Sequence, residues 1–215
     1  MDQRDIRHVF AILQKEARNW QDATVGNITK DPFLVLVGAL LSHRTQDRTT
    51  HRVLQRLVAS FTKPEDFLHV SEEDLVHLLY PVGFYREKAR RLQQIARILL
   101  EEYGGKVPES EEELLRLPGV GRKTANLVLS VAFGKPAICV DTHVHRITNR
   151  WGLVATKTPE ETERELQKKL PQELWGSINK LLVLLGQNIC LPRRPHCSRC
   201  PVAPFCKRQG VTDAR

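Results

Sequence analysis

Apolar residues recur at intervals of three and four along most of this chain, which is the spacing of amphipathic helices. The stretch 33–41 is apolar on every side, so it predicts a helix at the centre of a core. Alternation of apolar and polar residues is not sustained anywhere, although residues 137–140 could form a short extended segment. The pattern therefore predicts an all-α protein. An amphipathic helix within the first twenty residues has its apolar positions at Ile6, Val9, Phe10 and Leu13.

Small polar residues mark where several of these helices begin. Asp31 followed by Pro32 is typical of a helix N-cap with proline in the first helical position. Capping boxes at 71–74 and 110–113 predict two further starts, and Thr158 with an acidic first turn predicts another. These signals divide the chain into helices joined by short turns.

The sequence LPGVGRKTAN, residues 117–126, lies between two helical patterns. Pro118 cannot continue the first helix, and Gly119 and Gly121 allow positive φ and leave backbone N–H groups uncovered. A tight hairpin that leads into a helix N-terminus favours an anion, because the free N–H groups and the helix dipole point the same way. An ordinary corner between two helices is the alternative interpretation.

The charge balance suits a polyanionic partner. Lys and Arg number 33 against 25 Asp and Glu, which gives a net charge of +8. No apolar run reaches the roughly 18–20 residues needed to span a bilayer, and the first residues lack a signal-peptide pattern. We therefore expect no membrane partner, an intracellular location in the cytoplasm or nucleoid, and cysteines that stay reduced.

Four of the five cysteines lie close together near the end of the chain, with six, two and five residues between successive members. Thiolates are soft ligands, so this group predicts either an iron–sulfur cluster or zinc, and the ligand type alone leaves both open. Prolines interrupt helix formation in this loop, so something other than a backbone ladder must hold it. The four are Cys190, Cys197, Cys200 and Cys206, and Cys139 lies outside the group.

The hairpin with Lys123, the segment VDTHVHRITNRWGL with Asp141, and the four cysteines follow one another in the order seen in helix-hairpin-helix DNA glycosylases. From about Asp31 to Cys206 the chain resembles the endonuclease III family. The resemblance implies two helical domains, 24–135 and 1–23 plus 136–215, flanking a DNA-binding cleft. It also implies that the cysteine loop carries a 4Fe-4S cluster.

The same resemblance implies the activity. We expect a base-excision-repair DNA glycosylase with AP lyase activity, acting as a monomer on double-stranded DNA that contains damaged bases or abasic sites. Lys123 would be the nucleophile that forms a Schiff base, favoured as a neutral amine by its helix N-terminus and by partial burial. Asp141 would assist as a carboxylate and also cap its own helix.

Further DNA contacts follow from matching positions in the family. Arg44 lies in the polar interruption 42–47, where bacterial members commonly carry Gln. Val82 and Phe84 lie in a turn that resembles the family's wedge, although core packing is the alternative for Phe84. A solvated helix face is the alternative for His143. The set of expected contacts is Gly119, Gly121, Arg122, Arg44, Val82, Phe84 and His143.

Two other functions compete with the bifunctional lyase. One is a mismatch or uracil-type glycosylase on the same scaffold, and the other is a non-catalytic DNA-binding or redox-sensing iron–sulfur protein. Lys123 and Asp141 together argue against the second, because a binding module needs neither of them. Lys123 also argues against the adenine-mismatch glycosylases, which lack this lysine.

Overall fold

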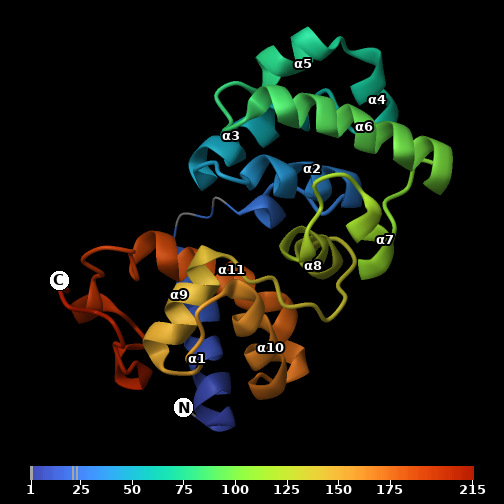
Figure 1. Ribbon diagram of the computed structural model, residues 1–215. Coiled ribbons are helices and arrows are strands. Elements are labelled where there is room, and N and C mark those ends of the chain that lie inside the picture. The colour runs from blue at the N-terminus through green and yellow to red at the C-terminus, as the bar shows by residue number, and fades with distance from the viewer. Residues whose placement is uncertain (1, 21, 23) are drawn as a thin grey trace. The chain divides into compact units, whose positions relative to one another are not determined.

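The computed structural model describes residues 2–20, 22 and 24–215 of the chain. The all-α prediction is confirmed, because these residues form α-helices joined by turns and short 3₁₀ segments, without a strand (Figure 1). Residues 137–140 have no regular secondary structure. Across the described parts of the chain, every helix is too short or too polar to cross a membrane.

The chain forms two compact units. We call Ala23–Lys135 the hairpin unit, and Met1–Asp22 with Pro136–Arg215 the cysteine unit. The domain division expected from the sequence and this one both place a boundary between residues 135 and 136. At the other boundary the two divisions differ only in the unit to which residue 23 is assigned. Residue 23 lies outside the described residues. The cysteine unit is therefore built from two segments that are far apart in the sequence.

The hairpin unit is organised around two helices. The apolar helix α2 contacts α3, α6 and α8, and its residues 33–41 are all buried, as the pattern predicted. The long helix α6 packs against α4 and α5 (Figure 1). The helices are α2 (Pro32–Ser42), α3 (Asp47–Leu57), α4 (Pro64–His69), α5 (Glu72–Leu79), α6 (Tyr85–Tyr103), α7 (Glu111–Arg116) and α8 (Arg122–Val131).

The predicted helix starts are confirmed by side-chain caps. Asp31 accepts a hydrogen bond from the Leu34 amide at 2.9 Å, with Pro32 as the first residue of α2. Ser71, Ser110 and Thr158 each accept from the amide three residues later, at 3.1–3.2 Å. Each bond satisfies one of the backbone N–H groups that a helix start leaves unpaired, so the local sequence defines where these helices begin.

The cysteine unit packs α1 (Gln3–Glu16) against helices from the far end of the chain. These are α9 (Thr142–Trp151), α10 (Pro159–Lys169) and α11 (Trp175–Asn188). α11 contacts both α1 and α9, and the four apolar positions predicted for the first helix are all buried in this core. After α11 the chain has only two 3₁₀ turns, Cys197–Arg199 and Ala203–Phe205, and these lie in the cysteine loop.

Candidate active site and metal centre

The hairpin between α7 and α8 has the geometry of an anion site. The Val120 amide donates to Leu117 O at 3.1 Å and closes the turn, and Gly119 has a φ of 77°. Gly121 is the N-cap of α8 with an extended φ of −104°, so the expected use of positive φ applies to Gly119 alone. Among the described residues, the N–H groups of Gly119 and Gly121 have no hydrogen-bond acceptor. They are available to a ligand at the start of a helix.

An arginine from α6 lies against this hairpin. The end of the Arg91 side chain lies where a Cβ on Gly119 would be, and the positive φ of Gly119 is what favours glycine at this position. Arg91 also pairs with Glu87 one turn earlier on α6. Arg122 is exposed at the first position of α8, where it pairs with Glu111 at 3.4 Å. Two guanidinium groups therefore flank the uncovered amides.

Lys123 occupies the second position of α8 and is exposed. The expected partial burial of Lys123 is not observed. The whole start of α8 lies at the surface, since residues 121 and 122 are exposed as well. The next residue, Thr124, is buried, and its hydroxyl lies 2.9 Å from His43 Nε2. Burial, followed by the positive charges of Lys123, Lys88 and Arg91, lowers the pKa of His43 from 6.5 to about 4. His43 is therefore a neutral ring close to the candidate nucleophile.

Asp141 is confirmed as the N-cap of α9. Its Oδ1 accepts hydrogen bonds from the amides of His143 and Val144 at 2.8 and 2.9 Å. Both hydrogen bonds that this half-buried carboxylate accepts from the described residues go to Oδ1. Asp141 belongs to the cysteine unit and Lys123 to the hairpin unit, so each unit contributes one member of the expected catalytic pair.

His143 does not lie on a freely solvated face. Its ring lies against α11, where a Cβ on Gly186 would collide with Nδ1, and its Nδ1 lies 3.2 Å from Nη2 of Arg146. Arg146 in turn donates to the carbonyl of Cys190 at 2.9 Å. The first turns of α9 are thus connected to the start of the cysteine loop.

The structure separates the two residues of the expected wedge. Phe84 is 56% exposed, which excludes core packing, whereas Val82 is 1% exposed. A buried side chain cannot reach DNA, so the expectation that Val82 contacts DNA is not supported. Arg44 is exposed, and its guanidinium carbon lies 5.5 Å from the centre of the Phe84 ring. Arg44 and Phe84 are therefore neighbours on the surface of the hairpin unit, although 40 positions separate them in the sequence.

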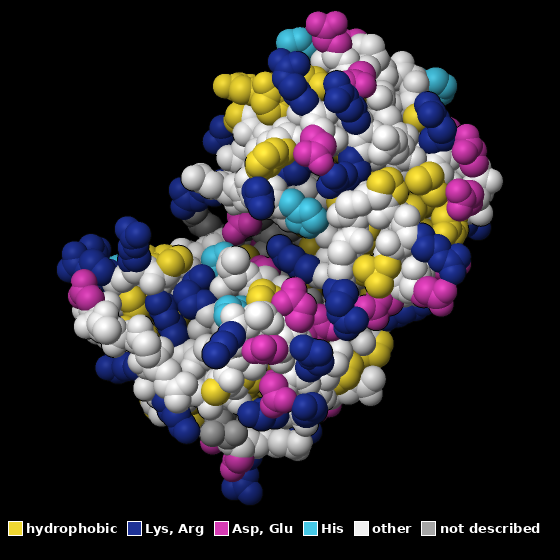
Figure 2. Space-filling view, viewed as in Figure 1, with side chains coloured by type: hydrophobic (Ala, Val, Ile, Leu, Met, Phe, Trp, Pro, Cys, Tyr) yellow, Lys and Arg dark blue, Asp and Glu magenta, His cyan; other side chains and the backbone are white. Residues whose placement is uncertain are grey.

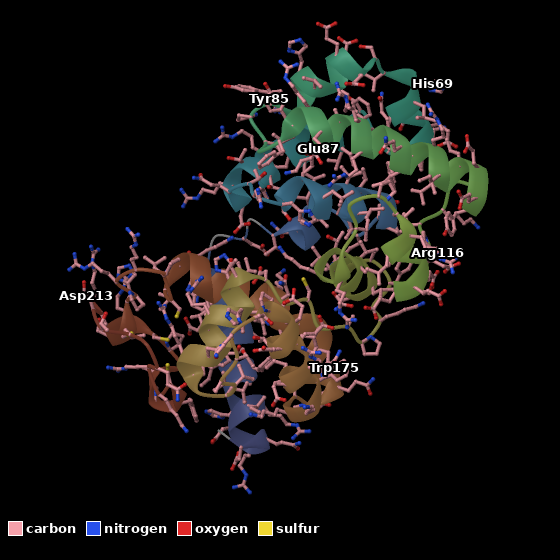
Figure 3. All side chains as sticks on the ribbon, viewed as in Figure 1. His69, Tyr85, Glu87, Arg116, Trp175 and Asp213 are labelled. Carbon is pink, nitrogen blue, oxygen red and sulfur yellow. The ribbon has the colours of Figure 1, made fainter. Side chains whose placement is uncertain are left out.

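The four cysteines of the loop surround one cavity. All four are half-buried and line it together with Trp151 and Ile189 (Figure 3 draws sulfur in yellow). Burial, followed by the other three thiols, raises the pKa of the Cys200 thiol to about 11, against a smaller lowering by a backbone hydrogen bond at Val202. Arg150 donates to Cys190 Sγ at 3.4 Å, and the Arg208 amide donates to Cys206 Sγ at 3.3 Å.

This donor set fits a polynuclear iron–sulfur group. Four half-buried cysteine sulfurs line one cavity, and Cys thiolates are the ligands that hold iron–sulfur clusters. The N–H donors near Cys190 and Cys206 would stabilise thiolates, and iron would overcome the raised pKa of Cys200.

Comparisons with known proteins agree with these features. Residues 37–172 match the family described as HhH-GPD superfamily base excision DNA repair protein. Endonuclease III of Thermotoga maritima is 50% identical over 188 residues, which cover 86% of this chain and 88% of that protein.

Two solved structures share the fold over nearly the whole chain. A non-covalent endonuclease III–DNA complex superposes with a TM-score of 0.85 at 34% identity, and covers 97% of this chain and 96% of the other. A trapped covalent endonuclease III–DNA intermediate superposes with a TM-score of 0.82 at 36% identity, and covers 97% of each chain. The chain therefore belongs to the endonuclease III family, within the HhH-GPD superfamily of base excision DNA repair proteins.

Proposed function

We propose that this protein is a bifunctional DNA glycosylase and AP lyase that removes oxidised pyrimidines from double-stranded DNA. The observation that carries the proposal is the position of Lys123, exposed at the start of α8 directly after the hairpin with its uncovered amides. A phosphate bound at the hairpin brings a deoxyribose within reach of this amine. The trapped covalent DNA intermediate of an endonuclease III with the same fold supports this chemistry.

The reaction requires the damaged nucleotide outside the base stack. The neutral Lys123 amine attacks C1′, and the bond from C1′ to the base breaks with its electron pair leaving on the base, which takes up a proton. Loss of the amine proton and opening of the sugar ring give a Schiff base between Nζ and C1′. A proton then leaves C2′ and the C3′–O bond breaks, so that the strand is cut 3′ to the lesion by β-elimination. Water finally hydrolyses the Schiff base and releases Lys123.

Asp141 assists this sequence as a carboxylate. It stabilises positive charge that develops on the sugar as the base departs, and it accepts the proton that Lys123 loses. Its two cap bonds to α9 hold the carboxylate in one orientation. The helix cap and the catalytic role therefore use the same rigid placement of one side chain.

The remaining contacts position and distort the DNA. The amides of Gly119 and Gly121 with Arg122 hold phosphate, which fixes the register without reading sequence. Phe84 enters the base stack as an apolar wedge, and Arg44 fills the gap that the extruded nucleotide leaves. His143 contacts the backbone from the first turn of α9.

We infer that Cys190, Cys197, Cys200 and Cys206 hold a 4Fe-4S cluster. When bound, the cluster supplies a fixed point for a loop that has little secondary structure of its own. Figure 2 shows Lys and Arg side chains, in dark blue, over this C-terminal segment. Arg194 pairs with Asp213 at 3.0 Å, so part of this positive charge is neutralised locally. The residues displayed for phosphate contact are Arg193, Arg194, Arg199, Lys207 and Arg208.

The protein acts as a monomer in the compartment that holds the DNA. A single chain supplies both Lys123 and Asp141, so the proposed chemistry does not require a second copy. Size-exclusion chromatography with light scattering should give the mass of one chain, and a stable dimer at working concentration would contradict this expectation.

Borohydride trapping on a duplex with an abasic site tests the proposed function. Borohydride reduces the Schiff base to a permanent protein–DNA adduct. Lys123→Gln should abolish trapping while lesion binding survives, because the substitution removes the amine and keeps most of the side-chain volume. The matched control is Lys106→Gln, which changes an exposed lysine in the turn after α6 and should trap like the wild type. An adduct at wild-type yield with Lys123→Gln would show that another amine is the nucleophile.

A further inference from the structure

Lys88 is a buried lysine on the first turn of α6. The residue is only 7% exposed, although the neighbouring first-turn residues Tyr85 and Glu87 reach the surface (Figure 3). Its Nζ donates to Leu41 O at 2.8 Å, to His43 O at 2.6 Å and to Thr45 Oγ1 at 3.1 Å. An ammonium group has three N–H donors, so these three acceptors use all of them.

The acceptors explain why a cation is buried here. Leu41 lies in the last turn of α2, where carbonyl groups lack partners within the helix and carry the negative end of its dipole. The chain then leaves the helix through residues 43–45, whose carbonyls also need donors. Lys88 supplies a positive charge and three donors at this point, so it caps α2 and fixes the loop that follows.

Thr45 extends the network to a second segment. Its hydroxyl donates to His43 O at 3.2 Å and accepts from Lys88 Nζ and from the Gly83 amide, each at 3.1 Å. A hydroxyl has one donor and two acceptor lone pairs, so this hydroxyl is fully used. The loop 43–45 and the turn 82–84 are therefore joined through the hydroxyl oxygen of Thr45, which is half-buried.

The two segments also touch directly and are strained. A Cβ on Gly83 would collide with the carbonyl oxygen of Arg44, so only glycine allows this approach. Arg44 has a φ of 51° and Phe84 a φ of 58°, in the left-handed region that non-glycine residues rarely occupy. Such conformations are unfavourable for residues other than glycine and persist where the surroundings hold them in place.

We propose that Lys88 is a positioning residue, which acts with the Thr45 hydroxyl to hold Arg44 and Phe84 ready to enter the duplex at a lesion. The inference rests on the proposed function, because that function gives Arg44 and Phe84 their roles. We call this arrangement, formed by residues 43–45, 82–84 and Lys88, the clamp. Lys88 touches neither the DNA nor the reacting atoms, and its effect passes through the backbone of the two segments.

The clamp matters only when a nucleotide must leave a base stack. Extrusion from a duplex costs a few kcal/mol, and side chains already held in the inserting conformation offset part of that cost. A single-stranded abasic site needs no extrusion, so Lys123 can react with it without the clamp. Damage to the clamp should therefore slow the reaction on duplex DNA and spare the reaction on single strands.

The experiment compares rates of borohydride trapping on duplex and single-stranded DNA of the same sequence with one abasic site. Thr45→Val removes the hydroxyl and keeps the shape, and Lys88→Met removes the ammonium group and keeps the length. Each should lower the duplex-to-single-strand rate ratio about tenfold, as expected when hydrogen bonds worth about 1–1.5 kcal/mol are lost. Thr45→Ser keeps the hydroxyl and should retain the wild-type ratio. The matched control is Thr50→Val, because Thr50 Oγ1 is buried and has no hydrogen-bond partner among the described residues.

Each result decides the proposal. An unchanged ratio in Thr45→Val overturns it, and so does an equal loss on both substrates by a variant with the wild-type melting temperature. If Lys88→Met fails to fold, Thr45→Val and Thr45→Ser decide alone. A wild type that forms no adduct with either DNA overturns the proposed function and this inference with it. A wild-type adduct combined with an unchanged ratio overturns only the inference.

Discussion

The clamp and the cysteine loop are both irregular backbone, and they are held in opposite ways. The clamp is held by the chain itself, through a buried ammonium and a hydroxyl with every donor and acceptor used. In the cysteine loop, short-range backbone bonds join Cys197 to Cys200, Cys200 to Ala203 and Ala203 to Cys206. Its centre is a cavity surrounded by thiols, which burial keeps protonated in the case of Cys200.

The difference shows what each region requires in order to form. The clamp can form as soon as α2 and α6 pack, because its donors and acceptors all come from neighbouring helices and turns. The edge of the cysteine loop is tied to α9 by Arg150, which donates to Leu191 O and to Pro192 O, each at 2.7 Å. The thiols at its centre offer each other only weak hydrogen bonds, and their thiolates repel one another. Irregular backbone at the proposed DNA contacts is thus stabilised by the chain alone in one unit, whereas in the other the cluster that we propose would add to the bonds of the chain.

The largest effect should come from breaking the cysteine loop. Cys197→Ser removes one of four ligands, so the variant should lose its iron and its broad absorbance near ~400 nm, which are expected of a 4Fe-4S protein. Because metal binding contributes to folding, the loop should become sensitive to proteases. Elemental analysis and the absorption spectrum measure the change.

Cys139→Ser is the matched control for this prediction. Cys139 is 1% exposed and lies outside the cavity, so its loss should leave iron content and colour unchanged. A colourless wild-type protein with one zinc per chain would contradict the cluster assignment.

Breaking the clamp by Gly83→Ala should have the next largest effect. The added methyl group meets the carbonyl oxygen of Arg44, and this backbone atom cannot move without disturbing both segments. We expect a loss of about 1–3 kcal/mol in the free energy of unfolding, typical of overpacking, and slower trapping on duplex DNA. Urea unfolding and the trapping assay measure the two effects.

Gly121→Ala is the matched control for this steric effect. A Cβ at Gly121 meets nothing within 4 Å, so this variant should keep its stability and weaken phosphate binding instead. Equal stability losses in the two glycine variants would contradict the close contact at Gly83.

A smaller effect should appear as pH rises past neutrality. Burial, followed by the charge of Arg91, lowers the pKa of Lys88 from 10.5 to about 8, and Glu87 raises it by a lesser amount. His43, whose carbonyl accepts from Lys88, carries a neutral ring at these pH values. Between the two pKa values the unfolded chain binds more protons than the folded one, so stability rises with pH. Relative to Lys88→Met, the free energy of unfolding of the wild type should rise across this pH window.

The duplex-to-single-strand rate ratio should change in the opposite direction. A neutral amine has two N–H donors for three acceptors, so the clamp loosens as Lys88 loses its proton and the ratio falls. Urea unfolding and trapping rates at about pH 7 and about pH 10 test both signs. If the free energies of unfolding of the wild type and Lys88→Met differ by the same amount across this pH range, the lowered pKa of Lys88 would be refuted.

The smallest effect should come from Arg44→Gln. The variant loses a cation–π contact with Phe84 worth about 0.5–1 kcal/mol at an exposed site, and it loses one positive charge. Stability should change little. The preference for the base opposite the lesion should shift, since we propose that the Arg44 side chain fills the gap left by the extruded nucleotide. Trapping rates on four duplexes that differ only in the opposite base measure it. If the wild type and the variant rank the four opposite bases in the same order, the proposal that Arg44 fills the gap left by the extruded nucleotide would be wrong.

Local signals in the sequence were sufficient for much of the fold. Asp31, Ser71, Ser110, Asp141 and Thr158 all cap the helices that their sequence context predicts, because capping depends on residues only three positions apart. The apolar helix α2 and the buried face of α1 were predicted for the same reason. The roles of Lys123 and of the four cysteines remain predictions from the family pattern.

Features that depend on contacts distant in the sequence were not predicted. Lys88 looks like a surface lysine, and its one signal is its place on the apolar face of α6 with Leu92, Ile95 and Leu99. Thr45 gave no signal, because the partners of its hydroxyl come from two other segments. The burial of Val82 and the exposure of Lys123 likewise depend on packing, which a local pattern does not contain.

The interrupted course of the chain has a consequence during protein synthesis. Helix α1 leaves the ribosome before its partners α9 and α11, which follow only after the whole hairpin unit has been translated. At about 5–20 residues per second the delay is on the order of ten seconds. Throughout that time the apolar face of Ile6, Val9, Phe10 and Leu13 has no native partner, while the hairpin unit can already fold. Until α9 and α11 emerge, the nascent chain therefore displays an apolar helix face that its own later segments will cover.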